Sequence, residues 1–136
     1  MIEIIKIETK GDTDIINISD KVQKTVDKSK NKEGIVNVFT RHTTAGIAIM
    51  ENEKGILMDF KEILERIAPV YSKYHHNEMQ SDNNGSLHFK ASLIGSSVSV
   101  PFREGKLLLG TWQQIFLVDF DTHAREREIV VNVIEG

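Results

Sequence analysis

The sequence predicts one α+β domain over residues 1–136, built from a largely antiparallel or mixed β-sheet and two main helices. The chain has 136 residues, and its 40% hydrophobic content is enough for one folded core. Short β-rich segments recur along it, and only two segments have apolar residues at helical spacing. Strands gathered around two helices, without a repeat, linker or low-complexity tract, indicate the α+β class.

In the first half of the chain, predicted strands alternate with the two helices. Apolar residues four apart predict a helix at 19–30, and a stripe from Ile56 to Ile67 predicts a second helix that Pro69 ends. Segments rich in β-branched residues predict strands, and Gly11 and Asp12 suit a hairpin turn between the first two. The strands expected in this half are 2–9, 14–18, 35–39 and 45–50.

The second half is predicted to contain only strands. Residues 71–85 form a polar segment before it, which we interpret as an active-site loop. The segment from Pro101 to Gly105 contains the proline and glycine typical of a hairpin turn. The strands expected in this half are 87–93, 98–101, 106–109, 115–120 and 129–134.

Composition excludes several classes of function. The chain has no cysteine, which excludes disulfides, thiolate zinc sites and cysteine catalysis, so any metal must be bound by histidine, carboxylate or water. The 17 basic and 20 acidic residues lack the basic excess of a general nucleic-acid binder. No apolar stretch approaches the ~20 residues of a membrane span. We therefore expect a cytoplasmic protein without a nucleic-acid or membrane partner.

Three histidines, His42, His76 and His88, are the leading candidates for catalysis. His42 is followed by Thr43 and Thr44, whose hydroxyls can hold an oxyanion or orient the ring. Three histidines with one open position are a known arrangement for catalytic zinc. The same side chains can instead act as general acid and base, or contact phosphate, without a metal. The residues alone leave both interpretations open.

The segment around His88 suits an anionic substrate. Lys90 lies two residues further along the predicted strand 87–93, which places both side chains on one face. An imidazole and an ammonium side by side suit a phosphate. Asp82 and Asn83 lie nearby in a segment typical of a turn. We predict that these residues bind a phosphorylated small molecule.

Carboxylates provide a weaker candidate for a divalent metal site. Glu51 and Asp59 are eight residues apart, about two helical turns, and are expected to share one helix face. Carboxylate oxygens are suitable ligands for Mg²⁺. The commoner use of such a pair is a solvated helix face.

Two further segments have both a structural and a functional interpretation. Gly110 suits a strand bend with Trp112 in the core, which we favour, or Trp112 stacks on a substrate ring whose edge Gln113 contacts. The segment 121–127 is typical of a charged hairpin, in which Arg125 can clamp a phosphate. Asp119, within an apolar strand, is expected to be paired or at an interface.

Several of these motifs occur in order along nearly the whole chain, and in combination they resemble one family. The chain resembles the YjbQ-like family, often described as secondary thiamine-phosphate synthases. Its pattern His-Thr-Thr/Ser matches residues 42–44, and His76 before an amide fits the family better than His75. The motifs are Arg41-His42-Thr43-Thr44, Tyr74-His75-His76-Asn77, His88-Phe89-Lys90-Ala91-Ser92 and Gly110-Thr111-Trp112-Gln113-Gln114.

The resemblance implies a small cytoplasmic α+β protein assembled as a homotrimer, with polar pockets at subunit boundaries. It also implies an activity that joins hydroxymethylpyrimidine diphosphate to thiazole phosphate and releases pyrophosphate, as a side activity in the family. A divalent metal, Zn²⁺ or Mg²⁺, is a candidate cofactor for such a displacement. The alternative is a non-catalytic module that binds a phosphorylated metabolite or a metal ion.

Overall fold

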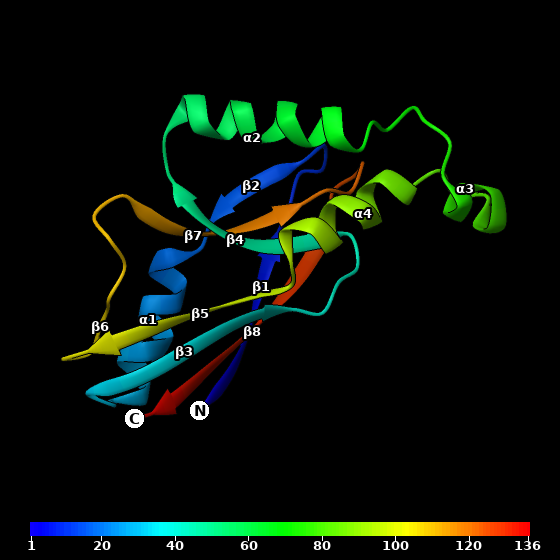
Figure 1. Ribbon diagram of the computed structural model, residues 1–136. Coiled ribbons are helices and arrows are strands. Elements are labelled where there is room, and N and C mark those ends of the chain that lie inside the picture. Colours follow the sequence, from blue (N-terminus) through cyan, green and yellow to red (C-terminus); the bar gives the residue numbers. More distant parts are fainter.

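The computed structural model describes residues 1–136 as two antiparallel sheets and four helices (Figure 1). The strands are β1 (Ile2–Glu8), β2 (Asp14–Asn17), β3 (Glu33–Thr40), β4 (Ala45–Glu51), β5 (Ser97–Arg103), β6 (Lys106–Leu107), β7 (Gln113–Asp119) and β8 (Glu126–Glu135), and the helices are α1 (Ser19–Ser29), α2 (Lys54–Ile67), α3 (His75–Gln80) and α4 (Gly85–Ile94). One sheet has the order β1-β8-β3-β5-β6, and the other has the order β2-β7-β4. None of the helices has the length and apolar character needed to cross a membrane.

The two sheets and α1 enclose the main hydrophobic core, and α2 and α4 cover the opposite face of the three-stranded sheet (Figure 1). Strand β7 is buried on both of its faces. Ile115 and Leu117 point into the main core, while Phe116 and Val118 point toward α2 and α4. This two-sided burial explains why the strand reads as a continuous apolar run.

The predicted α+β class is confirmed, with four helices rather than two. Both predicted helices form, and the Glu53 carboxylate caps α2 by accepting hydrogen bonds from the backbone N–H groups of Gly55 and Ile56. The predicted hairpin near residue 105 also forms, between β5 and β6. Its turn consists of Glu104 and Gly105, both at positive φ, and Pro101 lies inside β5 rather than in the turn.

The predicted strand 87–93 is wrong, because this segment is the helix α4. Its apolar residues are spaced two apart, and over seven residues that spacing also contains the four-residue spacing of a helix. Leu87 and Ala91 share one helix face and are buried against the three-stranded sheet, whereas Phe89 and Leu93 are exposed. Packing against that sheet therefore selects the helix.

The two expected hairpins at 2–18 and 121–127 are also wrong, because each turn connects the two sheets. Strand β1 pairs with β8, and β2 pairs with β7. The turn between β1 and β2 contains Gly11 with φ of 94°, and the connection at 121–127 leads from β7 to β8. Both connections lie at one end of the fold, where Asp12 N–H donates a hydrogen bond to the Asp121 carbonyl.

Candidate functional site

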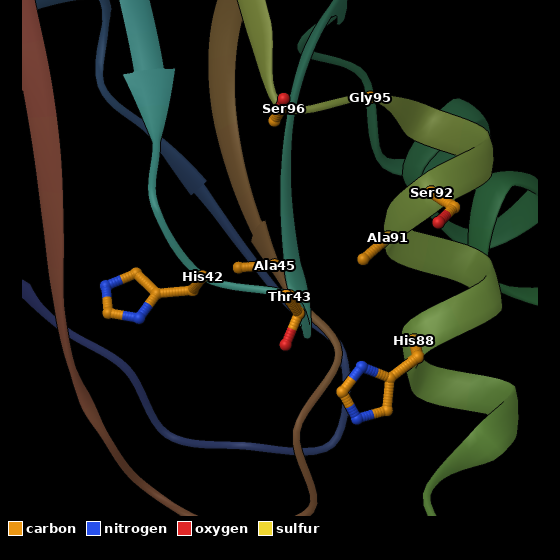
Figure 2. A pocket seen from close by; sticks show the side chains of 8 residues that line it. All are labelled: His42, Thr43, Ala45, His88, Ala91, Ser92, Gly95 and Ser96. Atoms are coloured by element: carbon orange, nitrogen blue, oxygen red, sulfur yellow. The ribbon is translucent and has the colours of Figure 1, made fainter. Parts of the chain in front are cut away.

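A cleft of about 450 Å³ lies between the β3–β4 connection and α4 (Figure 2). His42 and Thr43 come from the connection, and His88 projects from α4 on the opposite side. A second hollow of about 340 Å³ shares these three residues, so the two are lobes of one site. The neutral lobe adds Ala45, Ala91, Ser92, Gly95 and Ser96, and the arginine lobe adds Arg41, Thr44, Asn84, Asp121, Arg125 and Arg127.

Backbone hydrogen bonds fix the β3–β4 connection against the neighbouring segments. Thr40 N–H donates to the Ser96 carbonyl at 2.9 Å, and Ile47 N–H donates to the Gly95 carbonyl at 3.0 Å. A Cβ atom at Gly46 would lie 2.9 Å from the Gly95 carbonyl oxygen, so only glycine permits this approach. These contacts hold the ends of β3 and β4 against Gly95 and Ser96, which line the neutral lobe.

The ring of His42 is held in one orientation by the sheet. The backbone N–H of Glu128 donates to His42 Nε2 at 3.1 Å. Because Nε2 accepts this hydrogen bond, the neutral ring carries its proton on Nδ1. Burial lowers the pKa of His42, and the nearby Arg127 guanidinium lowers it further. His42 is thus a neutral imidazole near pH 7 with a Nδ1–H donor.

His88 is backed by a second histidine. The ring centroids of His76 and His88 are 4.6 Å apart. His76 Nε2 lies 3.1 Å from Asp82 Oδ1 and 2.7 Å from the side-chain amide of Asn84. The segment predicted as an active-site loop thus contains the short helix α3, which brings His76 to the edge of the site.

A buried ion pair, which the sequence interpretation did not include as a site element, lies beneath the arginine lobe. Arg127 Nε donates to Asp119 Oδ2 at 2.9 Å, and Nη2 donates to Asp119 Oδ1 and to Thr44 Oγ1, both at 2.8 Å. Thr9 Oγ1 donates to Asp119 Oδ2 at 2.6 Å. The expectation that Asp119 is paired is confirmed. The position of Asp119 in an apolar strand was the only feature of the sequence that indicated this network.

Opposing effects set the pKa of Asp119. Burial raises the pKa of this carboxyl, because the charged form loses its hydration. Hydrogen bonds from Arg127, Thr9 and the N–H of Asp121 favour the charged form and outweigh burial. The pKa of Asp119 therefore lies below its ordinary value, and the pair is ionised at neutral pH.

Arg125 lies at the rim of the arginine lobe. Its Nε donates to Asp121 Oδ2 at 2.7 Å, and the same oxygen lies 3.6 Å from Arg127 Nη2. The Arg125 side chain is half-exposed, so its other guanidinium nitrogens are open to solvent or a ligand. Its role in substrate binding stays a prediction.

The expected pairing of His88 with Lys90 on one face is wrong. Two residues on a helix point about 200° apart, so Lys90 faces away from the cleft. Lys90 is only 4% exposed, and its Nζ donates to Glu65 Oε2 at 2.7 Å. Burial raises the pKa of Glu65, but hydrogen bonds from Lys90 and Val70 outweigh it and hold that pKa below its ordinary value. Lys90 therefore joins α4 to α2.

Because the Lys90 ammonium is bonded to Glu65, replacing it is expected to leave anion binding unchanged. The variant Lys90→Met retains the aliphatic stem that packs between the helices. Isothermal titration calorimetry with inorganic phosphate should give the same dissociation constant for this variant and the unmodified chain. An affinity for phosphate about tenfold weaker, as expected for the loss of one charge-assisted contact, would show that Lys90 contacts the anion.

Five other predicted residues lie outside the cleft. Trp112 is 73% exposed in the β6–β7 connection, so its expected place in the core is wrong. Gln113 Oε1 accepts a hydrogen bond from the Gly110 N–H. Glu51 ends strand β4 while Asp59 lies on α2, so the expected shared helix face is also wrong. Asn83 has φ of 53° in the turn before α4.

The metal prediction has no preformed ligand set in this chain. His42 Nε2 accepts the Glu128 N–H, and His76 Nε2 contacts Asn84 and Asp82. No group of three or more histidine, aspartate or glutamate side chains is arranged to hold a metal ion. His42, His76 and His88 thus do not form a closed triad, and metal binding stays a prediction.

The comparisons with known proteins agree on one family. The family described as UPF0047 protein YjbQ-like matches residues 3–136. A UPF0047 protein from Archaeoglobus fulgidus is 38% identical over 130 residues, covering 96% of this chain and 98% of its own. A UPF0047 protein from Methanothermobacter thermautotrophicus is 40% identical over 129 residues, covering 95% and 88%.

Solved structures give the same result. A YbjQ-like protein of unknown function from Sulfolobus solfataricus has a TM-score of 0.91 at 33% identity, covering 100% of this chain and 99% of its own. An uncharacterized conserved protein of the yjbq/upf0047 family from Clostridium acetobutylicum has a TM-score of 0.89 at 37% identity, covering 97% and 99%. The chain therefore belongs to the UPF0047, YjbQ-like family.

Proposed function

We propose that the chain is a cytoplasmic enzyme that transfers a group between phosphorylated small molecules, with His42 as a hydrogen-bond donor and His88 as a proton-handling residue. One observation carries the proposal: the two imidazoles line a single cleft that has three arginines in one of its lobes. Such a cleft offers imidazole groups that donate hydrogen bonds or transfer protons, beside fixed positive charge. Those are the groups that a reaction with an anionic leaving group needs.

The specific reaction proposed is the joining of hydroxymethylpyrimidine diphosphate to thiazole phosphate. The bond between the pyrimidine methylene carbon and the diphosphate oxygen breaks, and a bond from that carbon to the thiazole nitrogen forms. Pyrophosphate leaves with the bonding electrons, so negative charge grows on its oxygen. The Nδ1–H of His42 and the guanidinium groups are suitable donors to that charge.

We also propose that three copies of the chain assemble around the outer face of the five-stranded sheet. This face carries exposed apolar side chains, which a monomer in water rarely leaves uncovered over a continuous area. It also carries Glu128, the residue whose N–H holds His42, so the site lies next to it. The exposed apolar residues are Ile2, Ile4, Ile35, Phe39 and Ile134.

The proposed reaction is tested by incubating the purified protein with both substrates, with and without added Zn²⁺ or Mg²⁺. Thiamine phosphate and an equal amount of pyrophosphate are expected, measured by chromatography and a pyrophosphate assay. The signal should disappear in His88→Ala but persist in His75→Ala, because His75 is fully exposed outside the cleft. Substrate binding without any product would favour the non-catalytic binding module instead.

A further inference from the structure

We propose that the two lobes bind different parts of the substrate. The arginine lobe binds a dianionic phosphate group, and the neutral lobe binds the uncharged remainder of the molecule. This inference rests on the proposed function and adds an orientation to it. The reacting atom of the substrate then lies between His42 and His88, the residues that both lobes share.

The charge of the arginine lobe favours a dianion. Arg41, Arg125 and Arg127 line it together with one carboxylate, that of Asp121. Even with Asp119 beneath the lobe counted against Arg127, one positive charge remains uncompensated. Guanidinium groups present planar forks that match phosphate oxygens, and Thr44 and Asn84 add polar side chains.

The guanidinium of Arg127 is already oriented for phosphate binding without a ligand. Its Nε and Nη2 hold Asp119 and Thr44, which fixes the plane of the guanidinium. Its Nη1 takes part in none of these bonds, and Arg127 lines the lobe. A donor that is already oriented loses little conformational freedom when it binds, which favours affinity.

The neutral lobe contrasts with this arrangement. It is lined by alanine, serine and glycine and contributes no charged side chain of its own. The nearest lysine on its helix, Lys90, is turned away and bonded to Glu65. A phosphate placed there would lose hydration without gaining a cation, whereas a ring or an alkyl group would lose little.

Direct binding measurements on the full chain test this division. Inorganic phosphate fills only the arginine lobe, whereas phenyl phosphate places its ring in the neutral lobe. Arg41→Gln and Arg125→Gln, both at exposed positions, are each expected to weaken the binding of both ligands about tenfold. Arg66→Gln on α2 is the matched control and should change neither dissociation constant.

A second variant tests the neutral lobe separately. Ser92→Leu projects a larger side chain from α4 into that lobe and suits a helix. It is expected to weaken phenyl phosphate about tenfold while leaving inorganic phosphate unchanged. Titration with malonate distinguishes a preference for phosphate from a general affinity for dianions, because the proposal requires weaker binding of the dicarboxylate.

The proposal is overturned if the double variant Arg41→Gln, Arg125→Gln binds inorganic phosphate as tightly as the unmodified chain. It is equally overturned if Ser92→Leu weakens both ligands alike. Neither result depends on turnover, so an absence of thiamine phosphate formation would reject the proposed reaction and leave the two-lobe assignment standing.

Discussion

Replacing Arg127 with methionine is expected to lower the free energy of unfolding by about 3–5 kcal/mol, the usual cost of removing one partner from a buried ion pair. Asp119 is completely buried, so the substitution leaves its carboxylate without a counter-charge. Thr9 and the N–H of Asp121 continue to donate to it, but neither carries a charge. Thr44 Oγ1 also loses the donor that connects it to the pair.

Urea unfolding followed by circular dichroism measures this change. The double variant Asp119→Asn, Arg127→Met removes both charges while keeping an acceptor for Thr9, and it should recover a large part of the lost stability. Arg103→Met, at an exposed position on β5, is the matched control and should stay within about 0.5 kcal/mol of the unmodified chain. Additive losses in the double variant would contradict a coupled pair.

The loss of stability in Arg127→Met is expected to depend on pH. The pKa of Asp119 in the folded chain lies below its unfolded value, so the pair's contribution to stability is present above the unfolded pKa, about 3.9. That contribution is lost as the pH falls through the folded pKa. The stability difference between the unmodified chain and Arg127→Met should therefore shrink as the pH falls into the acid range.

The ion pair also shows what the sequence could indicate and what it could not. An aspartate inside an apolar strand is costly unless paired, so a partner for Asp119 was predictable. The partner's identity was not, because Arg127 lies on β8 in the other sheet. The Asp119–Arg127 pair depends on the connection at 121–127, which leads from one sheet to the other but has the sequence pattern of a hairpin. Strands and the two amphipathic helices, by contrast, follow from local periodicity and were predicted.

The wrong prediction that Lys90 shares a face with His88 also arose from a feature that local sequence does not determine. A strand and a helix place residues two apart on the same face or on opposite faces, so the error in the type of one element reversed the direction of one side chain. The prediction of His88 as a site residue is unaffected by that error, because the helix α4 also brings His88 to the cleft that His42 lines. The cleft's two histidines were thus predictable from sequence. Its cations are Arg41, Arg125 and Arg127, of which only Arg125 was predicted as a site residue.

His88→Ala is expected to lower kcat/KM by about 10²–10⁴-fold, the range for loss of a general acid or base. His42→Ala is expected to lower it by about 10²–10³-fold, the range for loss of a hydrogen-bond donor to developing charge. Initial rates of pyrophosphate release measure the effect. His75→Ala and His123→Ala are matched controls, since neither ring lines the cleft, and both should retain full activity. Equal losses in a control variant would point to a fault in folding rather than in proton transfer.

The pH profile separates a role of His42 in catalysis from a role in packing. Protonation of Nε2 would set its new N–H against the N–H of Glu128, so activity should require the neutral ring. Because burial and Arg127 lower the pKa of His42, the folded chain keeps that form to a pH below the ordinary value of about 6.5. The acid limb of kcat/KM should therefore lie below pH 6.5. Between the lowered pKa of the folded chain and the ordinary pKa of the unfolded chain, the unfolded chain binds the extra proton. The free energy of unfolding of the unmodified chain should therefore decrease as the pH is lowered through this interval, and His42→Gln should lack this contribution. An acid limb at or above 6.5 would assign the titrating group to another residue.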